Sequence, residues 1–243
     1  MGLMPAMPKI HMPKRSKGQR MMRGRPITAE EYEKMLRTVP DVRPHDALAW
    51  QHYLRALWLS GLRLEESLVL SWDEDAPISV DLSGRHPRLR IYSEAEKGHR
   101  DRLLPMTADF AAYLLATPDR DHHGPVFKLD GLWTGKPITP RGVGRVVSAI
   151  GEKAGVIVNK GTNKYASAHD LRRAFGTRWA RKVMPSVLQK LMRHDSIETT
   201  LRYYVDLDAD ELAEELWRMS GSINTFINTP SLEHKKDEKE PGP

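Results

Sequence analysis

The sequence contains no cysteine among its 243 residues. This absence excludes disulfide bonds and thiolate metal sites, and it is compatible with the cytoplasm, where we expect the protein to reside. The chain also lacks any run of about 18 apolar residues, which excludes a transmembrane helix. Its first residues are rich in Met, Pro and Lys and contain no apolar signal core, so secretion is not expected.

Acidic residues are absent from positions 1–27, which contain seven Lys and Arg residues. The whole chain has a net charge of +6, so residues 28–243 carry −1 and the basic character lies in the N-terminal stretch. This composition predicts a disordered basic arm at 1–27, of a kind that often binds nucleic acid or another polyanion. A solubilising tail, or an upstream piece of a truncated chain, would have the same composition. Residues 219–243 are expected to form a second, solvated tail.

Hydrophobic residues make up 40% of the chain and mostly follow the i, i+3, i+4 spacing of amphipathic helices. Residues that typically cap helix N-termini accompany this spacing, namely Thr28 (with Glu31), Thr139 (before Pro140), Ser196 and Asp208 (with Glu211). Helices are therefore expected at 27–36, 46–60, 63–72, 107–117, 139–155, 167–182, 185–194, 197–205 and 209–219.

Residues 78–105 have the alternating, β-rich pattern of strands instead. The segments "ISVDL", "RLRIYSE" and "RDRLLPM" predict three strands, and "EKGHR" at 96–100 predicts the turn between the last two. The expected fold is therefore mainly α with a small antiparallel β-sheet (α+β), in one folded domain over 28–218.

Two helix starts combine a cation with a second polar group. Arg63 and Glu66 lie at i and i+3 in "SGLRLEESLVL", where an exposed ion pair is the commonest explanation. His169 and Arg172 share one face of the helix in "AHDLRRAFGTRWA". An Arg beside a His near a helix N-terminus suits an oxyanion or a phosphate, although a satisfied surface His is more frequent.

Two further patterns are weak when each is taken alone. Lys97 lies beside Gly98 at the predicted hairpin tip, where a Lys is usually just solvated but can also swing its ammonium group towards a bound phosphate. His194 lies nine residues before Tyr203, with Arg193 and Arg202 alongside. A buried or stacked ring is the usual explanation for a single tyrosine.

Together, in this order along the chain, four segments resemble the catalytic domain of the tyrosine recombinase (phage integrase) family: "SGLRLEESLVL", "EKGHRDRLLPM", "AHDLRRAFGTRWA" and "LMRHDSIETTLRYY". They span residues 60–204, and the resemblance extends over 28–218. It implies the fold of DNA breaking-rejoining enzymes, and catalytic roles for Arg63, Lys97, His169, Arg172, His194 and Tyr203. Because the family's nucleophile lies nine residues after the last His, the resemblance selects Tyr203 over Tyr204.

The resemblance implies the transfer of a DNA strand to a tyrosine. Arg63 and Arg172 would grip the non-bridging oxygens of a phosphodiester and stabilise its five-coordinate transition state. Tyr203 would attack the phosphorus and form a 3′-phosphotyrosine ester, which conserves the energy of the broken bond. The arginines take the role that a metal has in other enzymes, so neither a metal nor a cofactor is implied.

The other residues would move protons or orient groups. His169 would accept or relay the proton of the tyrosine, and Lys97 would protonate the leaving 5′ oxygen. His194 would donate a hydrogen bond to the phosphate, and Glu66 would orient an active-site side chain.

The implied partner is double-stranded DNA, bound by a homotetramer that exchanges strands through a Holliday junction. Such a protein would associate with the bacterial nucleoid when on DNA, and not with a membrane. Accessory DNA-bending or directionality proteins are further candidate partners, and residues 211–227 are a candidate for docking on a neighbouring subunit. The candidates for DNA contact are Arg141, Arg145, Arg193 and Arg202, although a solvated face explains the first two equally well.

Two features depart from the family pattern. Arg193 occupies a position that is commonly Gly, and residues 1–27 cannot form the N-terminal helical domain that usually completes a clamp around DNA. The chain would therefore be a catalytic fragment, or a minimal or degraded enzyme. Three alternatives remain: a type IB topoisomerase, a decayed integrase that only binds DNA, and a generic helical protein in which the six residues scatter in space.

Overall fold

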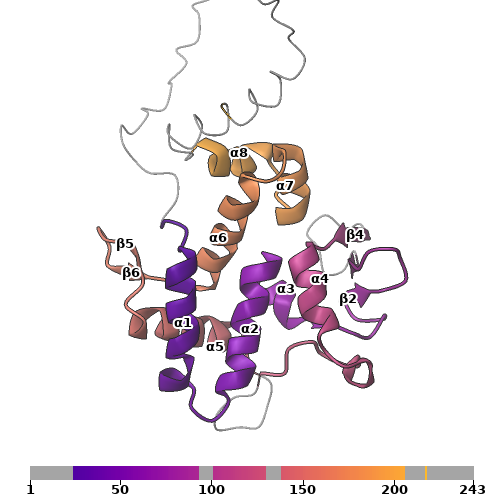
Figure 1. Cartoon of the computed structure of the whole chain (residues 1–243), viewed down its shortest axis with the longest axis horizontal. Coiled ribbons are helices and arrows are strands. Elements are labelled where there is room, and N and C mark those ends of the chain that lie inside the picture. The colour runs from indigo at the N-terminus through magenta and orange to yellow at the C-terminus, as the bar shows by residue number, and fades with distance from the viewer. Residues whose placement is uncertain (1–23, 93–100, 130–137, 206–216, 218–243) are drawn as a thin grey trace, which may run out of the picture.

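The structure, a computed structural model, describes residues 24–92, 101–129, 138–205 and 217. Its helices are α1 (Ala29–Val42), α2 (Ala47–Ser60), α3 (Leu64–Leu68), α4 (Ala108–Leu115), α5 (Pro140–Lys153), α6 (Ala168–Ala180), α7 (Pro185–Met192) and α8 (Ile197–Val205), with a 3₁₀ turn at Asp119–Asp121. Its strands are β1 (Leu70–Ser71), β2 (Ile78–Asp81), β3 (Arg88–Ile91), β4 (Arg102–Pro105), β5 (Ile157–Asn159) and β6 (Lys164–Tyr165). The expected fold class, mainly α with a small sheet, is confirmed (Figure 1). None of the described helices is long and apolar enough to cross a membrane.

The predicted helix caps are present where the structure describes them. Thr28 Oγ1 accepts the Glu31 N–H at 3.2 Å, and the Glu31 carboxylate accepts the Thr28 N–H at 3.0 Å, so the capping box is confirmed. Ser196 Oγ accepts the Glu198 N–H at 3.1 Å before α8. The remaining predicted cap, at 208–211, lies outside the described residues.

The main sheet contains β1, β2, β3 and β4 in that spatial order. The pairs β2–β3 and β3–β4 are antiparallel, as expected. The helix prediction is wrong at its C-terminal end, because α3 ends at Leu68 and Leu70 pairs in parallel with Ile78 of β2. A helix of five residues gains little from its own hydrogen bonds, so the burial of Leu70 and its pairing with β2 decide the local structure.

A second sheet, which the sequence pattern does not predict, consists of the antiparallel strands β5 and β6. Ile157 lies opposite Tyr165, and the connection between the strands includes Asn163 in the left-handed region, with φ 47°. The open edge of β5 binds the chain that precedes α1, since the Arg25 N–H donates to the Val158 carbonyl at 3.0 Å. Arg25, which falls within the predicted arm, thus contacts the folded domain.

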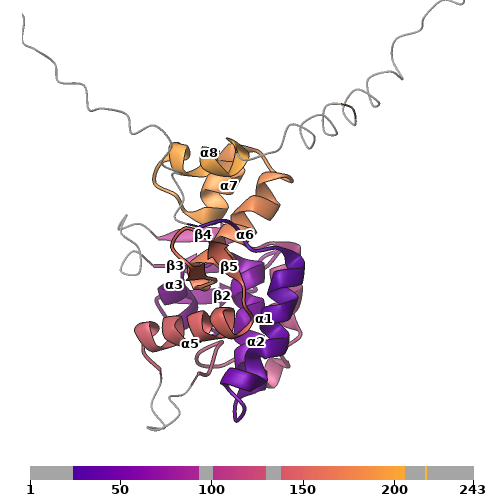
Figure 2. The same cartoon turned by 90° about the vertical axis from the view of Figure 1, so that its left-hand side faces the viewer.

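Buried side chains form two clusters. The larger cluster joins α1, α2, α4, α5, the main sheet and the first turns of α6, with Trp50, Tyr53 and Leu171 among its members. The smaller cluster lies where α6, α7 and α8 meet, and consists of Phe175, Ala180, Leu188, Met192 and Tyr203. Figure 2 shows α7 and α8 beyond the end of α6, apart from the rest of the helices. Helix α6 therefore connects the two clusters.

Candidate active site

An open cleft of about 850 Å³ lies between the start of α3, one side of α5 and the start of α6. Helix α5 begins at Pro140, after Thr139, whose Oγ1 accepts the Gly142 N–H at 3.2 Å. The exposed Arg141 and Arg145 project from its first turns into the cleft lining. The opposite lining contains three of the residues that the sequence predicts to be catalytic, namely Arg63, His169 and Arg172.

Arg63 reaches the cleft because α2 ends in a left-handed turn. Gly61 has φ 60°, and a Cβ at this position would lie 2.3 Å from Phe175 Cδ1, so only glycine fits. Arg63 follows as the N-cap of α3, with its side chain 46% exposed. Its Nη2 donates at 2.8 Å to the carbonyl of Arg193, which lies in the turn that ends α7.

Arg172 is anchored to the same two turns but is only 5% exposed. Its Nη1 donates to the Gly61 carbonyl and its Nη2 to the Met192 carbonyl. Burial lowers the pKa of Arg172 to about 9, and the neighbouring Arg193 and Arg63 act in the same direction, so the group still carries its proton at neutral pH. Arg63 and Arg172 are therefore held by two successive carbonyl groups at the end of α7.

Glu66 lies between two arginines. Its Oε1 accepts Arg63 Nη1 at 2.7 Å and Arg193 Nε at 3.3 Å, and its Oε2 accepts the Arg63 N–H at 2.7 Å and Arg193 Nη2. Burial alone would raise the pKa of Glu66, but the Arg193 guanidinium and the bonds from Arg63 lower it below its ordinary value. The carboxylate is therefore ionised and shared.

His169 lies one turn before Arg172 on α6 and is half-buried. Burial lowers the pKa of His169, and the cation of Arg173 adds to this effect, so the imidazole is neutral and can accept a proton at neutral pH. The start of α6 is fixed by Asp170, a fully buried carboxylate that accepts the Ser167 hydroxyl at 2.6 Å and Lys164 Nζ at 3.0 Å.

His194 and Tyr203 lie next to each other, outside the cleft lining. Their rings stack with 5.8 Å between centroids and an interplanar angle of 13°, and His194 Nδ1 is 2.9 Å from Thr200 Oγ1. Burial lowers the pKa of His194 to about 4, with Arg172 and Arg63 contributing, so this imidazole is also neutral at neutral pH.

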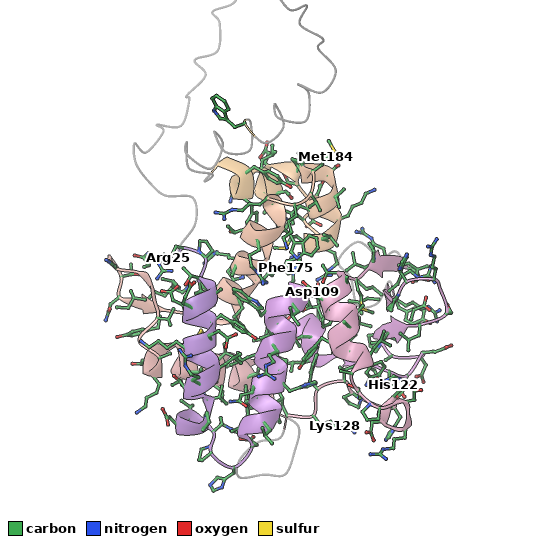
Figure 3. The ribbon with its side chains drawn as sticks, viewed as in Figure 1. Arg25, Asp109, His122, Lys128, Phe175 and Met184 are labelled. Atoms are coloured by element: carbon green, nitrogen blue, oxygen red, sulfur yellow. The ribbon has the colours of Figure 1, made fainter. Side chains whose placement is uncertain are left out.

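The Tyr203 ring belongs to the smaller hydrophobic cluster and is 9% exposed. It packs so closely on α6 that a Cβ at Gly176 would lie 2.5 Å from Tyr203 Cε1. Burial raises the pKa of Tyr203, while the cations of Arg172 and Arg173 act in the opposite direction. Figure 3 labels Phe175, a member of the same cluster, between the end of α2 and the α7–α8 pair.

The neighbouring Tyr204 points elsewhere. Its hydroxyl donates to the Val183 carbonyl at 2.5 Å, in the connection between α6 and α7. The two adjacent tyrosines therefore have different surroundings. Of the two, Tyr203 is the one that stacks on His194 and on whose pKa the charge of Arg172 acts.

Comparison with known proteins identifies the architecture. Residues 25–211 match the model of the "Phage integrase family". The chain belongs to the phage integrase family. No curated protein matches the sequence.

Solved structures with the same fold are tyrosine recombinases. The crystal structure of XerA recombinase is 19% identical, with a TM-score of 0.53 over 89% of this chain and 66% of that one. The Tn1549 transposon integrase in complex with transposon right end DNA is also 19% identical, with a TM-score of 0.54 over 80% of this chain and 66% of that one. XerH recombinase bound to difH substrate is 20% identical, with a TM-score of 0.50 over 79% of this chain and 53% of that one. This phage integrase family member thus spans two thirds or less of each of these structures.

The structure brings together most of the residues predicted for a phage integrase site. Arg63, His169 and Arg172 share the cleft, and the stacked pair of His194 and Tyr203 lies outside its lining, near enough to Arg172 and Arg63 for their charges to act on His194. Lys97 lies outside the described residues, as does most of the segment predicted to dock in trans. Glu66 contacts Arg63, and its orienting role stays a prediction.

The four candidate DNA contacts differ in their surroundings. Arg141 and Arg145 are exposed in the cleft lining. Arg202 is half-buried on α8, where its cation acts on the pKa of Tyr203. Arg193 is 5% exposed, and its guanidinium binds Glu66.

Two parts of this site are not predicted from the sequence. The Arg193–Glu66 pair joins residues 127 positions apart, which no local spacing can reveal. The role of Asp170 had a local signal, because Ser167 and Asp170 have the i, i+3 spacing of a capping pair.

Proposed function

We propose that this chain is a site-specific DNA recombinase that cuts and rejoins double-stranded DNA through a covalent bond to Tyr203. Membership of the phage integrase family supports this reading, as does the DNA bound to the Tn1549 integrase and XerH in their structures. The observation that carries the proposal is the convergence of Arg63, Arg172 and His169 on one open cleft. A phosphodiester in this cleft would meet two guanidinium groups from separate helices, and such groups can stabilise the negative charge of a pentavalent transition state.

The reaction exchanges one phosphate ester for another. Tyr203 Oη attacks the phosphorus, its proton passes to the neutral His169, and the bond from phosphorus to the 5′ oxygen breaks. The leaving 5′ oxygen takes a proton, for which the sequence offers Lys97 as the donor. The product is a 3′-phosphotyrosine ester and a free 5′ hydroxyl, and attack by a 5′ hydroxyl reverses the step without ATP.

Electrostatics favours the charged transition state over the resting tyrosine. Arg63 and Arg172 remain cationic, and each retains N–H donors beyond those used by the carbonyls that anchor it. Tyr203 is buried against Gly176, and burial opposes the formation of a phenolate. The hydroxyl therefore becomes reactive only when α8 moves and Tyr203 leaves this packing for the cleft.

DNA would approach the side of the molecule that α5 lines. Arg141 and Arg145 are exposed there and can contact phosphates or base edges. A homotetramer that exchanges strands through a Holliday junction is the assembly we propose, and accessory proteins would act on it.

The decisive test compares the two adjacent tyrosines. Nicked duplexes, recovered from a random pool by their affinity for the protein, would trap a covalent adduct because the cleaved strand diffuses away. We expect Tyr203→Phe to abolish the adduct on a denaturing gel, because it removes the attacking oxygen. The matched control Tyr204→Phe should retain the adduct.

Other outcomes of this experiment would favour the alternatives. An adduct that persists in Tyr203→Phe and disappears in Tyr204→Phe would overturn the assignment of the nucleophile. Tight binding of every duplex with no adduct from the unmodified protein would indicate a decayed integrase that only occupies DNA. Relaxation of supercoiled plasmids without any site preference would indicate a topoisomerase.

A further inference from the structure

Arg193 combines an unfavourable backbone conformation with a buried charge. It ends α7 with φ 48° and ψ 52°, a left-handed conformation that side chains other than glycine and asparagine rarely adopt. Its side chain is only 3% exposed, although burial of a guanidinium group is costly. The left-handed backbone and the buried guanidinium both cost free energy, and both occur at the turn that holds the two cleft arginines. This coincidence indicates that the Arg193 side chain has a function there.

The partner of Arg193 is the carboxylate that also holds Arg63. Arg193 Nε donates to Glu66 Oε1 at 3.3 Å and Arg193 Nη2 donates to Oε2, so Arg193 shares both carboxylate oxygens with Arg63. Arg63 Nη1 donates to the same carboxylate at 2.7 Å, while Arg63 Nη2 donates to the Arg193 carbonyl at 2.8 Å. Arg193 therefore holds Arg63 twice, through its own carbonyl group and through Glu66.

We propose that Arg193 is a positioning residue for DNA cleavage, whose guanidinium neutralises Glu66 so that the charge of Arg63 remains available to the scissile phosphate. This inference rests on the proposed function, because it assigns a second residue to the same reaction.

The physical argument is the balance of charge around the phosphate. Without Arg193, Glu66 would be paired with Arg63 alone, and its negative charge would lie within a few ångströms of a phosphate bound by Arg63. Arg63 and Arg172 would then outnumber Glu66 by one charge only. With Arg193 present, Arg63, Arg172 and Arg193 together outnumber Glu66 by two charges.

Direct contact between Arg193 and DNA does not fit the described arrangement. Arg193 is absent from the cleft lining, whereas Arg63 and Arg172 belong to it. The side chain of Arg63 is 46% exposed and that of Arg193 3%, so a phosphate in the cleft meets Arg63 first.

The test separates charge from size with a matched pair of variants. Arg193→Lys keeps a cation beside Glu66, whereas Arg193→Gln is neutral, and both carry a long flexible side chain in the same backbone conformation. We expect Arg193→Gln to lower the single-turnover cleavage rate at saturating DNA about tenfold, with the DNA dissociation constant changed much less. Arg193→Lys should retain most of the rate.

A second substitution tests whether Arg193 acts through Glu66. In Arg193→Gln combined with Glu66→Gln, the uncompensated carboxylate is gone, so we expect the rate to recover several-fold relative to Arg193→Gln alone. Lys190→Gln is the control, because it removes one exposed cation from the same helix. It should leave the cleavage rate unchanged.

Three results would overturn the inference. They are a wild-type cleavage rate in Arg193→Gln, a failure of Glu66→Gln to recover the rate, and a loss of DNA affinity that accounts for the whole effect. The last of these would assign Arg193 to DNA contact.

A readout without DNA keeps the inference distinct from the proposed function. The Arg193 cation lowers the pKa of both His194 and Glu66, so NMR titration of Arg193→Gln should show both pKa values raised, while Lys190→Gln shows neither change. If the unmodified chain forms no adduct with any duplex, the proposed function fails, and these titrations alone decide whether Arg193 neutralises Glu66. Unchanged titrations would refute that role as well.

Discussion

At the scale of single residues, most of the surroundings of His194 oppose its protonation, and Asp195 acts in the opposite direction. Burial is the largest effect, and the cations of Arg172, Arg63 and Arg193 act in the same direction, which lowers the pKa of His194 from 6.5 to about 4. The neutral ring retains its contact with Thr200 and its stacking on Tyr203. The arginine cluster thus fixes the protonation state of a neighbour as well as presenting positive charge to the cleft.

This shift predicts how the free energy of unfolding depends on pH. Between pH 6.5 and about 4 the unfolded state binds a proton at His194 that the folded state does not, so stability falls as the pH is lowered through this window. Because the ring is partly exposed, we expect the contribution to be about 1–2 kcal/mol. His194→Gln should flatten the pH dependence of urea denaturation by this amount.

A control keeps that measurement specific. His86 is exposed, and His86→Gln should leave the slope of the wild-type curve unchanged. An identical fall in stability for His194→Gln and the wild type would show that His194 does not titrate as the surrounding charges require.

At the same scale, the resemblance carried by four short segments and their order along the chain implies catalytic roles for Arg63, His169 and Arg172. The structure gathers these three residues in one cleft, and their roles stay a prediction. The Arg193–Glu66 pair could not be predicted, because it depends on how the end of α7 docks against the start of α3. Such a contact is a property of the tertiary structure, and the sequence pattern of a single helix does not predict it.

At the scale of elements, the site depends on two left-handed turns, at Gly61 after α2 and at Arg193 after α7. Each turn presents a carbonyl to a cleft arginine, and each redirects the chain so that a catalytic candidate follows within two residues. Glycine after a periodic run marks the first turn in the sequence. The second turn carries an arginine and gives no such local signal.

The turn at Gly61 can be tested against a second glycine with nearly the same backbone conformation. Gly61→Ala combines a φ of 60° with a Cβ that would lie 2.3 Å from Phe175 Cδ1, so we expect a loss of about 2–4 kcal/mol in the free energy of unfolding. Gly155→Ala has a φ of 66° but meets only Lys34 Nζ, at 3.7 Å, and should lose about 1 kcal/mol. Equal losses in urea denaturation would show that the contact with Phe175 is unimportant.

Elements whose hydrophobic periodicity is long were predicted well, and short ones were not. The apolar spacing predicts helices α2, α5 and α6, and the caps at Thr139 and Ser167 mark where α5 and α6 begin. Strands β1, β5 and β6 contain two or three residues each, which is too few for a period to emerge. Their structure is decided by pairing with a neighbour, as Leu70 with Ile78 shows.

At the scale of the whole molecule, the candidate site straddles two hydrophobic clusters of unequal size. Arg63 and His169 extend from elements of the larger cluster, whereas Tyr203 belongs to the smaller one, which is connected to the rest by α6 and by the contacts of Arg193 with Arg63 and Glu66. The site is therefore complete only when the α7–α8 pair is docked in place.

Unequal clusters predict unequal local stability. We expect backbone amides of α7 and α8 to exchange with deuterium faster than those of α2 and α5, because opening the smaller cluster exposes less apolar surface. Mass spectrometry of peptides from the intact chain would measure this difference under native conditions. Equal protection in all four helices would mean that the chain opens as a single cooperative unit.

The adjacent tyrosines constrain how α8 can move. Consecutive residues on an α-helix point about 100° apart, and the Tyr204 hydroxyl is fastened to the Val183 carbonyl ahead of α7. Rotation of α8 about its own axis to release Tyr203 would break this hydrogen bond, whereas a joint movement of α7 and α8 would preserve it. The Tyr204 hydrogen bond thus favours movement of the two helices as one unit. Because the carbonyls of Met192 and Arg193 anchor the cleft arginines, such a movement would also shift these two carbonyls.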